Sequence, residues 1–285
     1  MDKEQPILRK PEWLKIKLPN GIKTTAVVGM LNQRGLHTIC SSGLCPNKGE
    51  CWGRGTATFM IGGNICTRAC RFCNVATGKP LPLDDKEIEH IVKSVKELGL
   101  KHVVITSVDR DDLEDYGCSH WCKLIEALKM QCPGVTMEVL IPDFRGDSSL
   151  IERIIQLKPD VISHNLETVK RLTPTVRSVA KYETSLSVIR IIASSGIRSK
   201  SGIMLGLGET SEEILETLKD LREAGCEVIT IGQYLQPSRK HFPVKRYVEP
   251  CEFEEYARLG KKMGFRHVES GPLVRSSYHA EKHVN

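Results

Sequence analysis

The chain has 285 residues, of which 40% are hydrophobic and 27% charged, with a net charge of +6. This balance supports a sizeable core and excludes a disordered or collagen-like protein. No apolar run approaches the roughly 20 residues that span a bilayer, and the first residues lack the apolar stretch of a signal peptide. We therefore expect a cytoplasmic protein that does not bind membranes.

The positive charge is concentrated at the two ends. Residues 1–39 and 236–285 each carry a net charge of +4, whereas residues 40–235 carry −2. Two solvated end segments would explain this distribution, and so would an acidic partner that contacts both ends. Nucleic acid is not expected as a partner, because the sequence has no basic helix, zinc finger or paired RNA-binding aromatic motif.

Residues 1–55 form an N-terminal extension that ends in a group of three cysteines, here called the upstream triplet: Cys40, Cys45 and Cys51. Their spacing is C-x4-C-x5-C, which supplies one ligand fewer than a full set of four. A zinc ion completed by His37 is one interpretation. A second iron–sulfur cluster is favoured, because another cysteine group begins only fifteen residues downstream of Cys51.

From residue 56 onwards, strand-like runs alternate with amphipathic helical stretches, the pattern of parallel βα units. The predicted strands are residues 56–61, 102–106, 135–141, 161–163, 203–205 and 228–231. The predicted helices are residues 84–98, 118–131, 150–157, 182–194 and 211–224. Ser148 is expected to cap the third helix, and Thr210 with the following acidic residues is expected to begin the last.

Six such units fill residues 56–235 and are too few for a closed eight-unit barrel. The expected fold is therefore α/β, a partial (βα)6 TIM-like barrel with the N-terminal extension 1–55 and a C-terminal closing segment 236–285. An open doubly wound sheet is the alternative. In both architectures ligands bind where the strands end, so the loops at 66–73, 107–112, 164–167 and 206–209 should converge.

The loop after the first predicted strand holds a second group of cysteines, the downstream triplet: Cys66, Cys70 and Cys73. Their spacing is C-x3-C-x2-C. Three thiolates on one short loop can bind three irons of a cubane cluster and leave the fourth iron open for a small molecule. Zinc is the rival, but structural zinc favours paired C-x2-C hairpins and no second pair follows.

With Phe72 just before its last cysteine, this loop resembles the radical S-adenosylmethionine (SAM) superfamily. The resemblance implies a 4Fe-4S cluster on the downstream triplet, with its open iron chelated by the amino and carboxylate groups of S-adenosyl-L-methionine. Reductive cleavage then yields a 5′-deoxyadenosyl radical that removes hydrogen from unactivated carbon. The resemblance also implies a nucleotide pocket near Asp109, Asn165 and Glu167. Glu209 follows another strand, and helix capping explains it equally well.

Near its end the chain reads Arg275-Ser276-Ser277-Tyr278. Together with the two triplets, this signature makes residues 19–280 resemble the lipoyl synthase family. In that family a serine of the signature completes an auxiliary 4Fe-4S cluster on cysteines that match the upstream triplet. Ser277 matches that serine, although spacing alone does not separate it from Ser276.

The family resemblance implies insertion of sulfur at C6 and C8 of an octanoyl group held on a lysine of a lipoyl carrier protein or domain. The auxiliary cluster would supply the sulfur. The family resemblance also implies an electron donor such as ferredoxin or flavodoxin, and an iron–sulfur cluster delivery protein. The alternatives are another radical sulfur-inserting enzyme, such as a methylthiotransferase or a biotin-synthase-like protein, and a zinc or iron–sulfur protein that binds nucleic acid. The order of the triplets and the terminal serines argue against the first alternative.

Several further residues have less specific interpretations. Lys200 and Arg145 could reach a carboxylate or a carrier surface, but solvated charge is the favoured interpretation. Cys118 and Cys122 share one helix face, where packing is favoured over a metal pair. The remaining cysteines are interpreted as small core residues or surface thiols, namely Cys132, Cys226 and Cys251.

Overall fold

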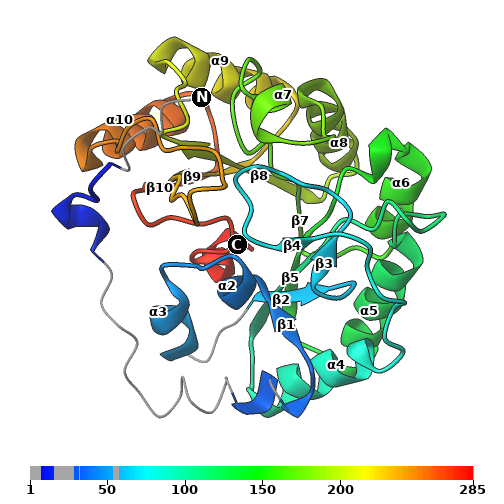
Figure 1. Ribbon diagram of the computed structural model, residues 1–285. Coiled ribbons are helices and arrows are strands. Elements are labelled where there is room, and N and C mark those ends of the chain that lie inside the picture. The colour runs from blue at the N-terminus through cyan, green and yellow to red at the C-terminus, as the bar shows by residue number, and fades with distance from the viewer. Residues whose placement is uncertain (1–7, 16–28, 32, 54–57, 285) are drawn as a thin grey trace.

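The computed structural model describes residues 8–15, 29–31, 33–53 and 58–284 and centres on an eight-stranded sheet (Figure 1). The strand order is β1-β2-β5-β6-β7-β8-β9-β10, and every pair is parallel except β1 with β2. Within the described ranges β1 and β10 do not pair with each other, so the sheet is open. The strands are β1 (His37–Thr38), β2 (Thr58–Ile61), β5 (His102–Ser107), β6 (Thr136–Leu140), β7 (Val161–Ser163), β8 (Arg198–Leu205), β9 (Val228–Gln233) and β10 (His267–Gly271).

Helices cover the outer face of this sheet (Figure 1). Each presents an apolar stripe to the strands, as Ile91, Val92 and Val95 do in α4, where all three side chains are buried. The helices between consecutive parallel strands are α4 (Glu87–Glu97), α5 (Cys118–Gln131), α6 (Ser148–Gln156), α8 (Tyr182–Ser194), α9 (Ser211–Glu223) and α10 (Pro250–Lys262). In the part of the chain that is described, no helix has both the length and the apolar character needed to cross a bilayer.

The predicted alternation of strands and helices is confirmed. All six predicted strands are present, although residues 56 and 57 lie outside the described residues. Two predicted helices, 118–131 and 182–194, have the observed bounds. The N-cap prediction for α6 is wrong, because Ser148 is already helical and the Asp147 carboxylate accepts from Ser149 N at 2.9 Å. Thr210 caps α9 as predicted, in a reciprocal pair with Glu213.

The two end segments each add a strand that the sequence analysis missed. β10 extends the parallel sheet beside β9, with His267 opposite Val228, and α10 is the helix that connects them. β1 pairs with β2 through only two residues. Neither strand has an apolar run, and every residue of β10 is half-buried. Hydrophobic patterning therefore did not identify them.

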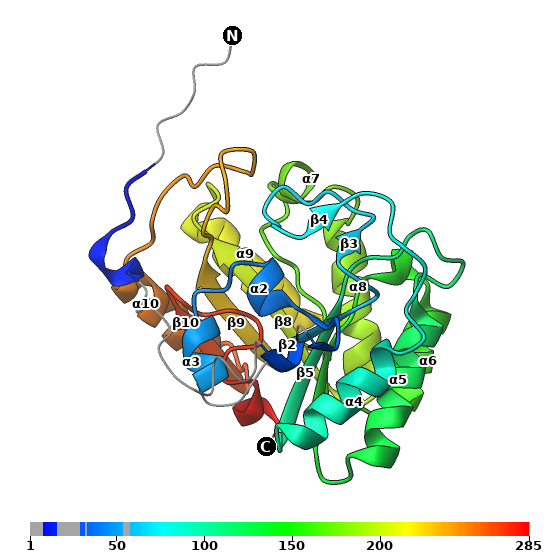
Figure 2. The ribbon, with the colours of Figure 1, turned by 60° about the horizontal axis from the view of Figure 1, so that its bottom comes forward.

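Because the long strands are parallel, their carboxyl ends lie at one edge of the sheet. Beyond this edge lie the short strands β3 (Ile65–Cys66) and β4 (Ala76–Thr77), together with the short helix α7 (Thr173–Val176), as Figure 2 shows. The helices α2 (Ile39–Ser42) and α3 (Lys48–Gly53), with the turn between them, carry the upstream triplet. The turn η3 (Ala280–His283), with the C-terminus, lies near the opposite end of β5 (Figure 2).

Two further 3-10 turns and one hydrogen bond complete the description. The turn η1 (Glu12–Leu14) belongs to the N-terminal segment, and η2 (Phe144–Gly146) follows β6. Tyr247 Oη donates to Leu8 O at 3.2 Å, which ties the N-terminal segment to the loop that follows β9. Parts of the two basic end segments of the chain therefore lie next to each other.

Candidate functional site

The chain leaves β2 through a glycine turn that directs it into the downstream triplet. Gly62 and Gly63 have φ of +81° and +92°, values that L side chains rarely adopt. Glu87 accepts from the amides of Gly62 at 3.0 Å and Gly63 at 3.3 Å, and Arg110 donates to Gly62 O at 3.1 Å. His120 contacts the same carboxylate at 2.6 Å. The start of the cysteine loop is therefore fixed by buried polar groups.

The downstream triplet lies on this loop as three half-buried free thiols. Burial raises the pKa of Cys66 to about 11, with a contribution from Asp109, and raises the pKa of Cys73 to about 12, where Cys70 and Cys66 contribute. The amides of Arg68 and Asp109 donate to Cys66 Sγ at 3.4 and 3.3 Å. Since amide donors to sulfur are typical of iron–sulfur sites, and bound metal holds thiols in the deprotonated form, the loop suits a cluster.

Arg68, inside the loop, connects it to two neighbouring strand ends. Its side chain is only 3% exposed and donates to both Asp111 oxygens, at 2.8 and 2.9 Å, and to Asp143 at 2.7 Å. Asp109 lies 3.3 Å from the same guanidinium. Although burial opposes it, Arg68 holds the pKa of Asp143 at about 2. The three carboxylates follow β5 and β6, so this network fastens the cysteine loop to both strands.

The upstream triplet lies on the other side of the cavity, on α2 and α3 and the turn between them. Cys40 is buried, and Cys45 has a pKa raised by burial and by the neighbouring Cys40 thiol. Asn74, next to the downstream triplet, donates to Ser42 O in α2 at 2.9 Å. A single side chain thus connects the segments that carry the two triplets.

The C-terminal turn meets the upstream triplet. Asn47, between Cys45 and Cys51, donates to Leu273 O at 2.7 Å. Gly232 of β9 permits this close approach, because a Cβ atom there would lie 2.1 Å from Val274 O. Burial lowers the pKa of Arg275, whose charge acts on Cys45.

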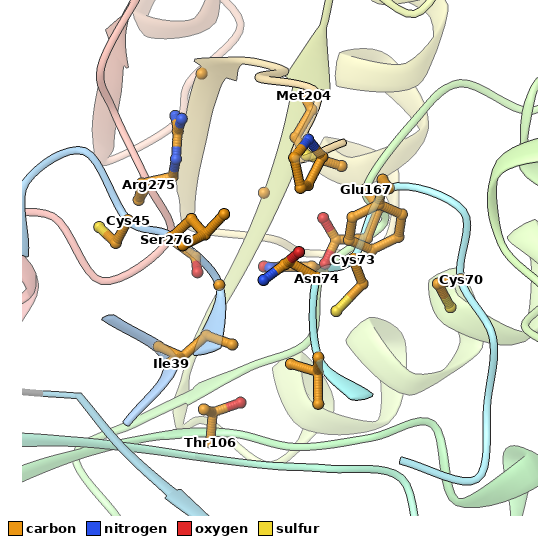
Figure 3. Close-up of a pocket in the computed structure, with 18 of the residues that line it drawn as sticks. Ile39, Cys45, Cys70, Cys73, Asn74, Thr106, Glu167, Met204, Arg275 and Ser276 are labelled. Carbon is orange, nitrogen blue, oxygen red and sulfur yellow. The ribbon is translucent and has the colours of Figure 1, made fainter. Parts of the chain in front are cut away.

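These parts surround one cavity of about 430 Å³. In Figure 3, Cys45, Arg275 and Ser276 lie on one side, Cys70 and Cys73 on the other, and Asn74 between them. The predicted site residues that line the cavity are Cys40, Cys45, Cys66, Cys70, Phe72, Cys73, Asp109, Asn165, Glu167 and Ser277. Cys51 is not among the lining residues, although it packs half-buried against the main core.

Part of the cavity wall beside the downstream triplet is apolar. Met60, Val75 and Val108 form a small buried cluster, against which Ile39 and the side chains of Cys66 and Cys73 pack. Such a surface excludes water from whatever occupies the cavity. It also suits an aliphatic chain.

The predicted nucleotide residues Asn165 and Glu167 face the same cavity. Asn165 Oδ1 is buried and has no partner in the described structure, and burial raises the pKa of Glu167. Glu167 also adopts a left-handed φ of +68° and pairs with β8, which fixes its backbone. A buried orphan acceptor beside a buried carboxylate suits a ligand that carries hydroxyl or ammonium donors.

Asp109 and Glu209 have additional or different contacts. Asp109 lines the cavity, but it also accepts from the Cys66 thiol, with Sγ to Oδ2 at 3.7 Å, and faces Arg68. Glu209 is buried and accepts from the amides of Gly206 and Leu207, at 2.5 and 2.9 Å. It closes the turn after β8 and does not cap α9, whose N-cap is Thr210, so the helix-capping interpretation of Glu209 is wrong.

Three side chains outside the cavity had predicted environments, and the prediction for Lys200 is wrong. Lys200 was expected to be solvated, but none of its side chain is exposed, because it pairs with buried Glu138 at 2.8 Å. Arg145 is 45% exposed and pairs with Asp111. Cys118 is buried and its thiol donates to Leu150 O at 3.3 Å, as the packing interpretation requires.

The zinc interpretation of the upstream triplet lacks geometric support. Over residues 8–15, 29–31, 33–53 and 58–284, no three His, Cys, Asp or Glu side chains are arranged to hold one metal ion. A single zinc needs its ligands around one point, whereas a cubane is held at its separate corners. His37 lies in β1 and does not line the cavity.

Three comparisons relate the chain to known proteins. The radical SAM superfamily pattern matches residues 60–232. A lipoyl synthase of Treponema denticola is 64% identical over 276 residues, which is 97% of this chain and 95% of the relative. A mitochondrial lipoyl synthase of Nematostella vectensis is 57% identical over 277 residues, with 97% and 95% covered.

Among solved structures, SuiB of Streptococcus suis bound to its precursor peptide superposes with a TM-score of 0.59 at 14% identity, covering 74% of this chain and 48% of SuiB. Methylornithine synthase superposes with a TM-score of 0.58 at 16% identity, covering 74% and 70%. At these identities the structural likeness concerns the fold alone.

Proposed function

The chain belongs to the lipoyl synthase family of the radical SAM superfamily, and from this premise we propose that it inserts two sulfur atoms into a protein-bound octanoyl-lysine group, at C6 and C8, to form the lipoyl cofactor. The observation that carries the proposal is a cavity of about 430 Å³ that is lined by the whole downstream triplet, by Cys40 and Cys45 of the upstream triplet, and by Ser277. A reaction that forms a substrate radical and then adds sulfur to it needs the radical-forming centre and the sulfur source to lie beside the same substrate. The cavity meets that requirement.

In this proposal, Cys66, Cys70 and Cys73 bind the radical SAM 4Fe-4S cluster. Cys40, Cys45, Cys51 and Ser277 bind the auxiliary 4Fe-4S cluster. When bound, the first cluster and SAM supply a one-electron cleavage that leaves methionine and a 5′-deoxyadenosyl radical, and the second supplies sulfide. The protein contributes ligands, orientation and a cavity from which water is excluded.

The other cavity residues have separable roles in the proposal. Asn165 and Glu167 accept hydrogen bonds from the polar groups of SAM. The Asn165 Oδ1 acceptor is unpartnered in the described structure, and the Glu167 carboxylate is buried. Phe72 packs at the cluster loop. Asp109 contacts the cysteine loop as well as the cavity. The apolar cluster of Met60, Val75 and Val108 accommodates the octanoyl chain between the triplets.

Ser277 is the proposed weak corner of the auxiliary site. A serine alkoxide is a hard ligand and matches iron–sulfide poorly, whereas thiolate is soft. Displacement of this ligand would help to release sulfide once a neighbouring sulfide carries carbon. The C-terminal turn brings Ser276 and Ser277 to the same cavity, so both stay candidates until they are substituted separately.

We divide the chain into an N-terminal extension at 1–55, a core at 56–235 and a C-terminal segment at 236–285. The core is interpreted as a partial (βα)6 barrel, and the end segments complete the open sheet with β1 and β10. The cytoplasm is the proposed location.

The proposed partners are an octanoylated lipoyl carrier, an electron donor such as ferredoxin or flavodoxin, and an iron–sulfur cluster delivery protein. An acidic carrier would meet positive charge at the cavity rim. Lys10 lines the cavity, and exposed Lys240 lies on the loop after β9, a few residues from the lining residue Pro237. Charge complementarity of this kind speeds association.

The test is anaerobic incubation of the reconstituted protein with reductant, SAM and an octanoyl-lysine peptide. Reconstituted chains should hold about eight irons, four for each cubane. The peptide should gain two sulfur atoms, and 5′-deoxyadenosine should accumulate. A fully metallated protein that leaves SAM uncleaved, or zinc on the upstream triplet, would refute the assignment.

A further inference from the structure

A buried ionic group lies beneath the cavity, inside the sheet. Side chains alternate along a strand, so Lys200, Gly202 and Met204 of β8 share one face, and the last two line the cavity. Lys200 therefore lies one layer below. Its ammonium donates to both oxygens of Glu138 at 2.8 Å, and Ser163 Oγ donates to Glu138 at 2.9 Å.

The last turn of the chain enters this layer. His283 of η3 has no exposed side-chain surface, and its Nδ1 lies 3.2 Å from Lys200 Nζ. Because an ammonium group only donates, Nδ1 accepts this hydrogen bond and the imidazole is neutral. Burial and the charge of Lys200 lower the pKa of His283 to about 2, which agrees with that assignment. Arg198 donates to the His283 carbonyl, so the backbone is held as well.

The segment 272–284, here called the strap, connects this anchor to the cavity. Its first half meets the upstream triplet through Leu273 and places Ser276 and Ser277 in the cavity wall. Six residues after Ser277, His283 is buried below the cavity floor. Figure 2 shows the end of the strap at the far end of β5, away from the loops that carry the downstream triplet.

Two buried side chains hold the end of the strap, Ala280 at the start of η3 and His283 at its end. His279 adopts a left-handed φ of +54° and Lys282 and Glu281 are exposed, whereas His283 is fully buried. His283, with its Lys200 and Arg198 contacts, therefore supplies a fixed point at the far end of the strap. A segment held at both ends has fewer accessible conformations than one held at a single end.

We propose that His283 is a positioning residue for the serine pair, anchoring the strap on Lys200 so that Ser277 is held at the upstream triplet. The proposal rests on the proposed function of Ser277 as an auxiliary-cluster ligand. The anchor lies below the layer of β8 that lines the cavity, on the side away from the two triplets, and it contacts neither of them.

The experiment compares His283→Leu with His283→Asn in the full chain. Leucine fills the buried space but cannot accept from Lys200, whereas asparagine places an oxygen near the position of Nδ1. We measure hydrogen exchange of the strap, iron per chain after reconstitution, and the ratio of sulfur inserted to 5′-deoxyadenosine formed. The ratio matters because a merely structural defect would lower both products together.

For His283→Leu, strap amides should exchange roughly tenfold faster, as expected for loss of one buried contact. Iron should fall toward the content of one cluster, and sulfur inserted per 5′-deoxyadenosine should fall about tenfold while SAM cleavage stays within about twofold. His283→Asn should restore most of the exchange protection and of the ratio.

Unchanged strap exchange and an unchanged ratio in His283→Leu would overturn the proposal, as would equal loss in both variants. His283→Ala provides a second test if leucine prevents folding, since it leaves the Lys200–Glu138 pair intact. If the wild-type chain never acquires iron on the upstream triplet, the proposed function fails, and hydrogen exchange alone still decides whether His283 anchors the strap.

Discussion

The two triplets differ in how the protein holds them. The downstream triplet lies on a loop fastened by a guanidinium, three carboxylates and a clamped glycine turn, all largely buried. The upstream triplet lies on two short helices and the turn between them, and it meets the C-terminal turn through hydrogen bonds such as Asn47 to Leu273. A centre that must survive each turnover needs a rigid mount, whereas one that gives up sulfide must be able to open. The difference in support agrees with the roles that we propose for the two triplets.

The strongest test of the rigid side is Arg68→Met. Removing one partner from a buried charge network leaves its carboxylates uncompensated and should cost about 3–5 kcal/mol of unfolding free energy. SAM cleavage should fall by about 100-fold, since misplacing a reacting group costs that much. Denaturant unfolding measures the first effect and a 5′-deoxyadenosine assay the second. Iron quantitation should show that iron on the upstream triplet is retained.

The matched control is Arg145→Met, because Arg145 reaches Asp111 from a side chain that is 45% exposed. Its effect on stability should stay within about 1 kcal/mol, as for exposed ion pairs. Equal effects of the two variants would mean that the buried network has no special role in holding the loop.

The contact between the upstream triplet and the C-terminal turn is tested next by Gly232→Ala. The added Cβ would lie 2.1 Å from Val274 O, so the C-terminal turn must move. Overpacking of this kind costs roughly 1–3 kcal/mol and should lower sulfur insertion about tenfold while SAM cleavage persists. Retention of all the iron on the upstream triplet, together with normal sulfur insertion, would contradict the proposed place of the serine pair.

Ser277→Cys sharpens the comparison by making the upstream site resemble a fully thiolate-ligated one. Thiolate binds iron–sulfide more durably than alkoxide, so iron release during turnover should slow, and sulfur insertion should fall by roughly tenfold. Ser276→Cys is the control and should leave both rates near those of the wild-type chain. The reverse result would assign the ligand to Ser276.

The smallest expected effect concerns the positive charges at the rim of the cavity. Reversing the charge of Lys10 and Lys240 should slow association with an acidic carrier about threefold to tenfold at low salt, and the difference should shrink as ionic strength rises. Lys219→Glu is a suitable control, because its side chain is 73% exposed on α9, which does not line the cavity. Stopped-flow association rates at several salt concentrations provide the measurement, and salt-independent rates would exclude electrostatic steering.

The sequence predicted the alternating core well because long apolar strands and amphipathic helices carry strong periodic signals, as in α5 and α8. It missed β10, whose residues are all half-buried and therefore lack an apolar run. Lys200 was interpreted as solvated because it lies outside the predicted strand 203–205, whereas β8 begins at Arg198. Its partner Glu138 lies 62 residues away in the chain, so the sequence carries no sign of the pair.

The cysteine spacings and the terminal serines predicted most of the candidate site, since their residue types are chemically specific. Spacing contained no information on Gly232, whose role depends on the close approach of Val274 O. Asn74 is also visible only in the fold, because it connects two segments that are distant in sequence. Contacts of this kind follow from the tertiary packing of segments rather than from local pattern.

The central claim is that sulfide from the upstream site enters the product. The direct measurement is a single-turnover reaction of protein whose clusters were reconstituted with isotopically heavy sulfide, followed by mass spectrometry of the octanoyl-lysine peptide and iron analysis of the protein. The account predicts heavy sulfur at both positions and loss of iron from the upstream triplet, with the downstream cluster retained. Product that carries only light sulfur, or complete retention of iron after product has formed, would contradict it.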